Sequence, residues 1–208
     1  ELEGKYGFAL WGLDSPDHSG TSVSGLGDIN GDGYDDLITG APYADPNGKG
    51  NAGESYVIFG QPNAYAVDSD GGIDLAKLNG SNGFRIDGID SGDTSGFSVN
   101  NAGDVNGDGL DDFVIGAARY PGTLRDVSET YNPNKGGPGE AYLIYGKKTG
   151  YKASMKLSEL DDSQGFVIEG IDKGDQAGWS VNTAGDVNLS LIHISEPTRR
   201  YAIAYAVL

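Results

Sequence analysis

Hydrophobic and polar positions follow one another in short runs along this chain and do not recur at helical spacing. Runs such as "TSVSGLG" (21–27), "DLITGA" (36–41), "SYVIFG" (55–60) and "FRIDGI" (84–89) are rich in β-branched and aromatic residues. Gly, Asn and Asp bound each run, which is typical of strands separated by turns. The pattern therefore predicts an all-β chain of short strands.

The same strand pattern recurs along the sequence. The segment that starts at Gly7 aligns without a gap to the segment that starts at Gly83, and a third copy starts at Gly165. The first two copies are complete, and Leu2 and Gly4 match the end of a preceding unit. The predicted repeats one, two and three cover about 7–82, 83–164 and, truncated, 165–188.

Four short strands per repeat predict the blades of a β-propeller. A β-sandwich of unrelated hairpins is the alternative, but a sandwich does not predict gap-free copies. Because a blade buries its faces only against neighbouring blades, two complete repeats plus partial ones form a partial propeller that depends on further blades. We therefore expect residues 1–188 to be an internal piece of a longer protein.

Composition narrows the classes of function. The chain has 208 residues, 35 Gly, no Cys and a formal net charge of −17. Such acidity argues against nucleic-acid binding, which needs Lys and Arg for phosphate contacts, and no run is long enough to insert into a membrane. An acidic surface suits divalent cations.

An acidic nonapeptide recurs between the first two predicted strands. Side chains at its positions 1, 3 and 5 converge when the backbone curls, and glycines at positions 4 and 6 permit the left-handed torsions of such a curl. The carbonyl at position 7 and the carboxylate at position 9 add oxygens, as Ca²⁺ prefers. The predicted metal ligands are Asp28, Asn30, Asp32, Tyr34 and Asp36 in repeat one and Asp104, Asn106, Asp108, Leu110 and Asp112 in repeat two.

Other interpretations of the nonapeptide fit less well. Mg²⁺ prefers strict octahedral geometry, and Zn²⁺ recruits His or Cys. An EF-hand needs a carboxylate at position 12, where this chain has Thr39 and Ile115. A plain hairpin turn explains one copy, but two copies with the same ligand types favour a metal. We expect the position-8 residues, Asp35 and Asp111, to lie in the outer shell or to face solvent.

The pattern "G-x-S-V…G-D-[IV]-N-G-D-G-x-D-D-[LF]-[IV]-[TI]-G-A" resembles the FG-GAP repeat of integrin α-chain propellers and of bacterial integrin-like proteins, and we expect a bacterial source. The resemblance covers nearly all of residues 1–188. It implies propeller blades with Ca²⁺ in the hairpin loop between the first two strands of a blade. The family's Phe-Gly pair is replaced here by Gly-Thr, Gly-Phe and Gly-Trp (20–21, 96–97 and 178–179), which leaves every carboxylate in place.

Repeat three breaks after "TAGDVN". Asp186 and Asn188 are left without counterparts of positions 5 and 9. The following "LSLIHISEPTR" resembles a translated sequencing-library adapter, so we interpret 189–208 as a non-native tail; a diverged terminal strand is the alternative.

The favoured function is a non-enzymatic, calcium-binding extracellular or cell-surface module for adhesion or for recognition of a protein or glycan. Calcium is then structural, neighbouring blades are partners within the chain, and the Tyr- and Pro-rich stretch from about 118 to 138 is the candidate recognition loop. The alternative is the propeller part of a larger secreted hydrolase, a glycosidase or phospholipase with catalysis elsewhere. With two His and no Cys, the chain supports no Ser/His/Asp or Cys/His arrangement.

Overall fold

The computed structural model describes residues 7–15, 17–63, 65, 67–69, 71–119 and 137–183. These ranges contain strands and short 3₁₀ turns and no α-helix, which confirms the all-β prediction. The 3₁₀ turns are Pro46–Gly48, Leu75–Lys77 and Leu157–Glu159. The strands are β1 Ala9–Trp11, β2 Ser22–Gly27, β3 Asp36–Ala41, β4 Glu54–Ile58, β5 Gly72–Asp74, β6 Gly83–Asp87, β7 Ser95–Gly103, β8 Asp112–Ala117, β9 Glu140–Ile144, β10 Ser154–Lys156 and β11 Gly165–Glu169.

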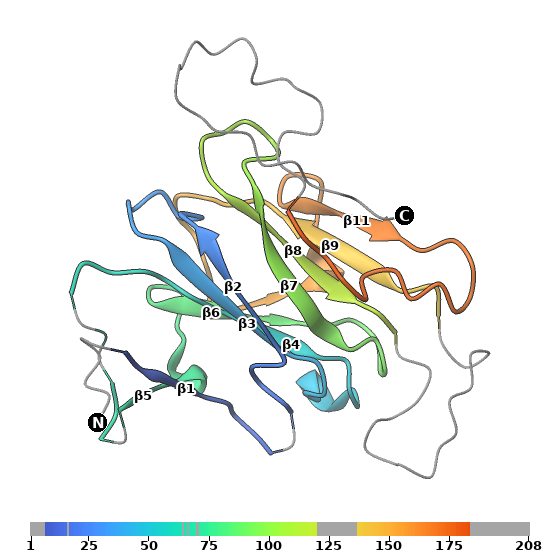
Figure 1. Ribbon diagram of the computed structural model, residues 1–208, viewed down its shortest axis with the longest axis horizontal. Coiled ribbons are helices and arrows are strands. Elements are labelled where there is room, and N and C mark those ends of the chain that lie inside the picture. Colours follow the sequence, from blue (N-terminus) through green and yellow to red (C-terminus); the bar gives the residue numbers. More distant parts are fainter. Residues whose placement is uncertain are drawn as a thin grey trace.

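Two sheets of the same design lie side by side (Figure 1). The first contains β2, β3, β4 and β6 in antiparallel order, and the second contains β7, β8, β9 and β11 in antiparallel order. This arrangement is that of two blades of a partial β-propeller, as the repeats predicted.

The sheets are offset from the sequence repeats by one strand. β6 opens repeat two but forms the outer strand of the first sheet, and β11 opens repeat three but closes the second sheet. Self-alignment of a sequence gives the period of a repeat and not its phase, so the offset becomes visible only in the structure. Each sheet thus contains strands from two successive repeats.

Parallel strand pairs add a second link between repeats. β10 pairs with β6 on the outer edge of the first sheet, and β5 pairs in the same way with β1. β1 corresponds in sequence to β6 and β11. Each repeat therefore lays one short strand along the outer strand of the sheet before it.

A shared hydrophobic core joins the two sheets. Leu26, Ile38 and Val57 of the first sheet and Phe113 and Ile115 of the second sheet belong to one buried cluster. Burial of these side chains requires both sheets at once, as expected for repeats that cannot bury their faces alone. The other face of the first sheet packs a smaller cluster around Tyr56 and Leu75.

Glycines let neighbouring repeats approach closely. A Cβ added to Gly40 of β3 would lie 1.9 Å from the carbonyl oxygen of Gly96, and a Cβ on Gly116 of β8 would lie 1.9 Å from that of Gly178. No side chain fits at these distances. The repeated contact shows that the described part of repeat three continues the same array.

Several sequence predictions lie outside the described residues. They are most of the 118–138 stretch, Asp186 and Asn188 of the third acidic loop, and the 189–208 tail.

Candidate metal-binding loops

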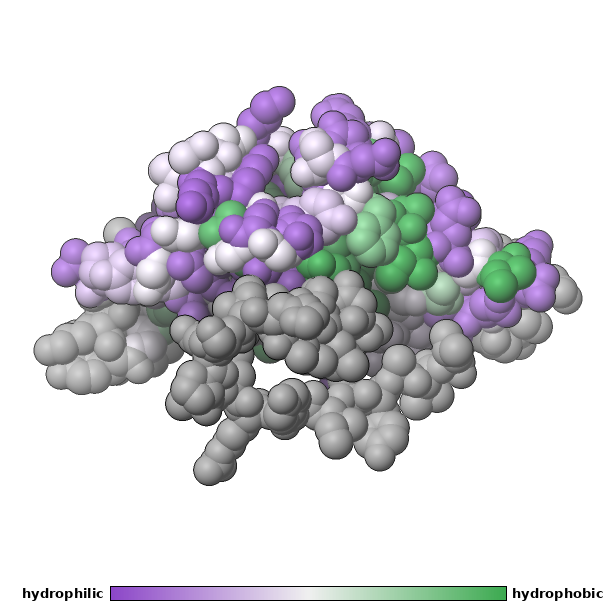
Figure 2. Space-filling model, turned by 90° about the horizontal axis from the view of Figure 1, so that it is seen from above, coloured by the Kyte–Doolittle hydropathy of each residue, from purple (hydrophilic) through white to green (hydrophobic). Residues whose placement is uncertain are grey.

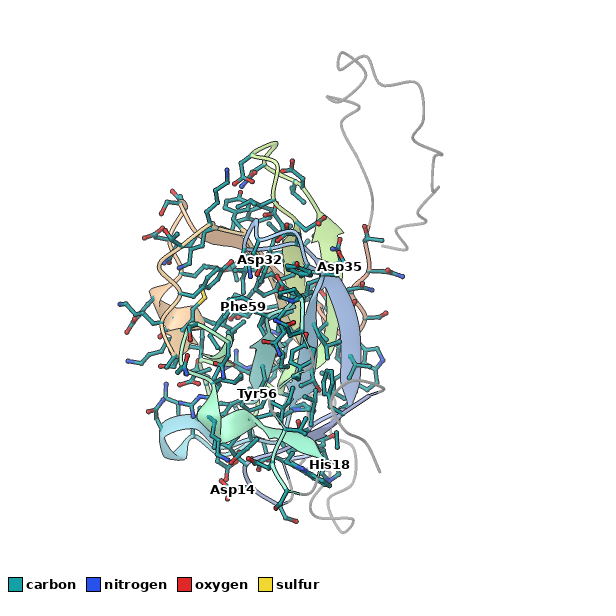
Figure 3. All side chains as sticks on the ribbon, turned by 90° about the vertical axis from the view of Figure 1, so that its left-hand side faces the viewer. Asp14, His18, Asp32, Asp35, Tyr56 and Phe59 are labelled. Atoms are coloured by element: carbon teal, nitrogen blue, oxygen red, sulfur yellow. The ribbon has the colours of Figure 1, made fainter. Side chains whose placement is uncertain are left out.

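The two acidic loops connect the first two strands of each sheet. Residues 28–35 join β2 to β3, and residues 104–111 join β7 to β8 at the same edge of the molecule (Figure 1). Figure 3 shows Asp32 and Asp35 at this end of the first sheet, with Asp14 and His18 at the opposite end. Among the described residues, hydrophilic ones dominate the view of the loop-bearing end, with one apolar patch near the centre and a smaller apolar group near one side (Figure 2).

The position-1 aspartate organises each loop by accepting three backbone hydrogen bonds. Oδ1 of Asp28 accepts from the N–H groups of Gly31 (2.7 Å) and Asp32 (3.0 Å), and Oδ2 accepts from that of Gly33 (2.8 Å). The corresponding distances around Asp104 are 2.7, 3.0 and 2.9 Å. The two loops therefore fold alike.

Positions 3 and 5 continue this pattern. The side-chain oxygen of Asn30 accepts from the Asp32 N–H (2.9 Å), and Asp32 Oδ1 accepts from the Tyr34 N–H (2.9 Å). The same two bonds, also 2.9 Å, link Asn106, Asp108 and Leu110 in repeat two.

The predicted left-handed torsions occur at positions 4 and 6. φ is 73° at Gly31 and 90° at Gly33, and the equivalent Gly107 and Gly109 have 78° and 87°. A side chain with a Cβ is strained in this region, so glycine at both positions permits the curl.

The position-9 aspartates are buried at the start of β3 and β8. Asp36 accepts from the N–H groups of Ile29 (3.0 Å) and Gly60 (2.8 Å). Burial raises the pKa of Asp36 to about 6; these two hydrogen bonds oppose the rise, and the charges of Asp32 and Asp28 add to it.

Asp112 repeats this environment and is fully buried. It accepts from the N–H groups of Val105 (2.8 Å) and Gly146 (2.9 Å). Burial again raises the pKa, to about 6, and hydrogen bonds with backbone N–H groups oppose the rise. In both loops, a carboxylate therefore lies in a place that disfavours its negative charge.

The predicted ligands of the two loops are of the chemical type that a hard cation prefers, but their carboxylates do not converge on one point. All ten predicted positions offer oxygen, and no Lys or Arg of the described ranges forms an ion pair with Asp36 or Asp112. Within those ranges, however, no three Asp, Glu, His or Cys side chains gather into a metal-binding group. Instead, the carboxylates at positions 1, 5 and 9 each bind N–H groups of the chain.

The position-8 aspartate of repeat two has a role that the sequence did not predict. Asp111 Oδ2 accepts from the Asp28 N–H (3.1 Å), and the Asp111 N–H donates to the Asp28 carbonyl (3.2 Å). Position 8 was expected to lie in the outer shell or to face solvent; for Asp111 the second alternative is wrong, because loop one packs against repeat two. Asp35, the equivalent residue of repeat one, is exposed.

A second pair of contacts fixes the same interface. The Ile29 carbonyl accepts from the Lys147 N–H (2.9 Å) and from the Tyr151 hydroxyl (3.0 Å). The Tyr151 ring stacks on Phe84 with centroids 4.7 Å apart. The sequence signal for this contact was a tyrosine five residues after the glycine of "VIFG" and "LIYG", at Tyr65 and Tyr151.

Two sheets of repeated four-stranded design, each with an acidic loop after its first strand, define the class as a repeat protein of the β-propeller type. The family model described as FG-GAP repeat matches residues 19–58 and 95–144. Those ranges contain both loops and the first three strands of each sheet. These two segments of the chain are thus similar to the FG-GAP repeat.

Curated relatives agree with this description. Integrin alpha pat-2 of Caenorhabditis elegans is 37% identical over 111 residues, 52% of this chain. Integrin alpha-PS2 of Drosophila melanogaster is 32% identical over 164 residues, 77% of this chain, and integrin alpha-IIb of Mus musculus is 32% identical over 98 residues, 47% of this chain. The matches span 8%, 10% and 8% of these relatives.

These relatives are animal proteins, and the expected bacterial source stays a prediction. No helix in the described part of the chain is long and apolar enough to cross a membrane.

Proposed function

We propose that this chain is a calcium-binding extracellular β-propeller module for adhesion or for recognition of a protein or glycan, in which calcium is structural. The observation that carries the proposal is that the acidic loop occurs twice with the same conformation. The chain builds the same hydrogen-bonded loop twice, from the same oxygen ligands and with distances that agree within 0.1 Å around position 1.

The chemistry of the loops favours Ca²⁺. Asp28, Asn30, Asp32 and Asp36 and the Tyr34 carbonyl would hold the ion in repeat one, with Asp104, Asn106, Asp108, Asp112 and the Leu110 carbonyl in repeat two. A divalent cation offsets the repulsion among three carboxylates per loop and the cost of burying the position-9 carboxylate. Bound calcium thereby stabilises the link between the first two strands. Affinities of about 10⁻⁴ to 10⁻³ M are usual for extracellular calcium modules.

The adhesion role rests on the similarity to integrin α chains. The chain spans about a tenth of the length of these relatives, so the binding partner of the whole protein belongs to the proposal. We propose no catalytic role for the described residues, since their acids recur in register as loop and turn positions do. Attachment to a secreted hydrolase remains the second candidate for the longer protein.

Calorimetric calcium titration tests the proposal. We expect two sites in the chain and one site in either Asp32→Ala or Asp108→Ala, with a higher melting temperature in millimolar calcium than in chelator. Asp35→Ala is the matched control, because Asp35 is exposed and at position 8, and it should keep two sites. An absence of calcium uptake by the folded chain would refute calcium binding, and an unchanged stoichiometry in Asp108→Ala would refute the ligand assignment.

A further inference from the structure

An exposed turn just before β6 has the sequence of a modification site. Residues 79–81 are Asn-Gly-Ser, and they follow the 3₁₀ turn Leu75–Lys77. Asn-x-Ser is the acceptor motif for asparagine-linked glycans when x is not proline. The other match in the sequence, Asn188-Leu189-Ser190, lies outside the described residues.

The turn brings the two side chains of the motif together. Asn79 Oδ1 accepts from the Ser81 hydroxyl (2.6 Å) and from the Ser81 N–H (2.9 Å). The Asn79 N–H donates to Asn82 Oδ1 (3.0 Å). Asn79 Nδ2 donates no hydrogen bond to any residue that the structure describes. The hydroxyl is therefore held beside the carboxamide, while the nitrogen to which a glycan is attached stays available.

Repeat two builds the same turn from an aspartate. Asp161 Oδ1 accepts from the Ser163 N–H (2.9 Å) and from the Ser163 hydroxyl (2.5 Å), as Asn79 Oδ1 does from Ser81. The turn needs only a side-chain oxygen, which Asp and Asn both offer. The Nδ2 atom of Asn79 is thus a group that the turn itself does not use.

Neighbouring repeats do not cover this turn. Repeat two lies beside Gly80, where an added Cβ would be 2.5 Å from the Tyr151 carbonyl oxygen, and Asn79 is nevertheless exposed. The turn of repeat two has repeat one as its neighbour instead, and Asp161 is exposed as well. The exposure of Asn79 is therefore a property of the turn, whichever neighbour is present.

We propose that Asn79 is the acceptor of an asparagine-linked glycan. Its Nδ2 atom attacks the anomeric carbon of an oligosaccharide carried on a lipid diphosphate, so that a C–N bond forms and the bond from this carbon to the diphosphate breaks. The diphosphate leaves with the electron pair of that bond, a base of the transferase takes one proton from Nδ2, and nothing is oxidised or reduced. The proposal rests on the proposed extracellular function, because the motif is used on secreted proteins.

Expression of the full chain with a cleavable secretion signal in eukaryotic cells tests the acceptor. Every variant carries Ser190→Ala, which removes the second match to the motif. We expect one glycan, seen as a mass increase that peptide N-glycosidase removes, and peptide mapping should place it at Asn79. Asn79→Asp, which recreates the turn of repeat two, and Ser81→Ala should each abolish the glycan, whereas Ser81→Thr should keep it. Because the glycan is attached before release, chain retained in the cells is analysed in the same way.

Repeat two offers a matched gain of the site. Asp161→Asn creates Asn-Asp-Ser in the equivalent turn and should add a second glycan. Asp162→Asn makes the same change of charge one residue later without creating the motif, and it should add none. A chain without a glycan at Asn79, whether or not Asp161→Asn gains one, would overturn the proposal.

Calcium titration of the same purified chains separates this proposal from the proposed function. Calcium uptake by a chain that carries no glycan would refute only the acceptor site. A glycan at Asn79 on a folded chain that takes up no calcium would refute only calcium binding and leave the acceptor site supported.

Discussion

Loops one and two have the same internal hydrogen bonds and different surroundings. Position 2 of loop one is Ile29, and repeat two covers this side chain completely. Position 2 of loop two is Val105, whose side chain is partly exposed to solvent. The outer strands differ in the same direction: β6 is covered by β10, but β11 leaves Phe166, Val167 and Ile168 between 39% and 49% exposed. The nonapeptide thus determines the conformation of a loop, and the next repeat determines how deeply it is buried.

The largest expected difference in the free energy of unfolding is between matched substitutions in β6 and in β11. Arg85 of β6 lies 2.6 Å from Asp87 and 3.6 Å from Glu54, both buried carboxylates, whereas the equivalent residue of β11 is Val167. Arg85→Met leaves these carboxylates without their cation and should cost about 3–5 kcal/mol in urea unfolding. Val167→Met, the matched change, should cost under about 0.5 kcal/mol. Equal losses would show that the two outer strands do not differ in this way.

The position-2 side chains should show the next largest difference. Ile29→Ala removes a fully buried side chain from the core and should lower the free energy of unfolding by about 2–4 kcal/mol. Val105→Ala removes a half-exposed side chain and should cost less than about 1 kcal/mol. If both cost the same in the monomeric chain, Val105 must be covered as well as Ile29.

A pH-dependent difference is expected between two aspartates of one turn in repeat two. Asp93 is buried, and burial raises its pKa to about 6. The hydrogen bond from the Asp90 N–H and the charge of Arg119 oppose the rise in pKa. Arg119 Nε lies 2.9 Å from Asp93 Oδ1 but does not form a hydrogen bond with it. Because its folded pKa is above the unfolded value, Asp93 stabilises the folded state most below pH 4, and this contribution is lost as pH rises through 6. The stability of the unmodified chain relative to Asp93→Asn should therefore fall by roughly 1–3 kcal/mol between pH 4 and pH 7.

Urea unfolding of the two proteins at both pH values measures this difference. Asp90→Asn is the control, since the Asp90 side chain is 61% exposed. An Asp93→Asn variant whose stability follows that of the unmodified chain at both pH values would contradict the raised pKa.

The smallest expected effect compares the two position-8 aspartates. Asp111→Ala removes the acceptor of the Asp28 N–H across the interface and should cost about 1–2 kcal/mol. Asp35→Ala, at an exposed position, should cost under about 0.5 kcal/mol. A double-mutant cycle between Asp111→Ala and Ile29→Ala would show coupling if the two act at one interface, and strict additivity would argue against it.

The sequence predicted most of the fold because its signals are local. The short runs "DLITGA" and "DFVIGA", rich in β-branched and aromatic residues, located β3 and β8. The glycines at Gly31 and Gly33 predicted the left-handed torsions that the loop has. The predicted repeat bounds, 7–82 and 83–164, do not coincide with the two sheets, because pairing of β6 with β4 is a contact between repeats. The role of Asp111 was missed for the same reason, since a nonapeptide considered alone does not contain its neighbour.

The chain crosses from one repeat to the next both through β6, which leaves its own repeat to complete the first sheet, and through β10, which runs parallel along β6. A pulling force along the chain cannot break the hydrogen bonds of this junction one after another. It must slide β10 along β6 and break their hydrogen bonds together. The junction between the repeats therefore resists shear.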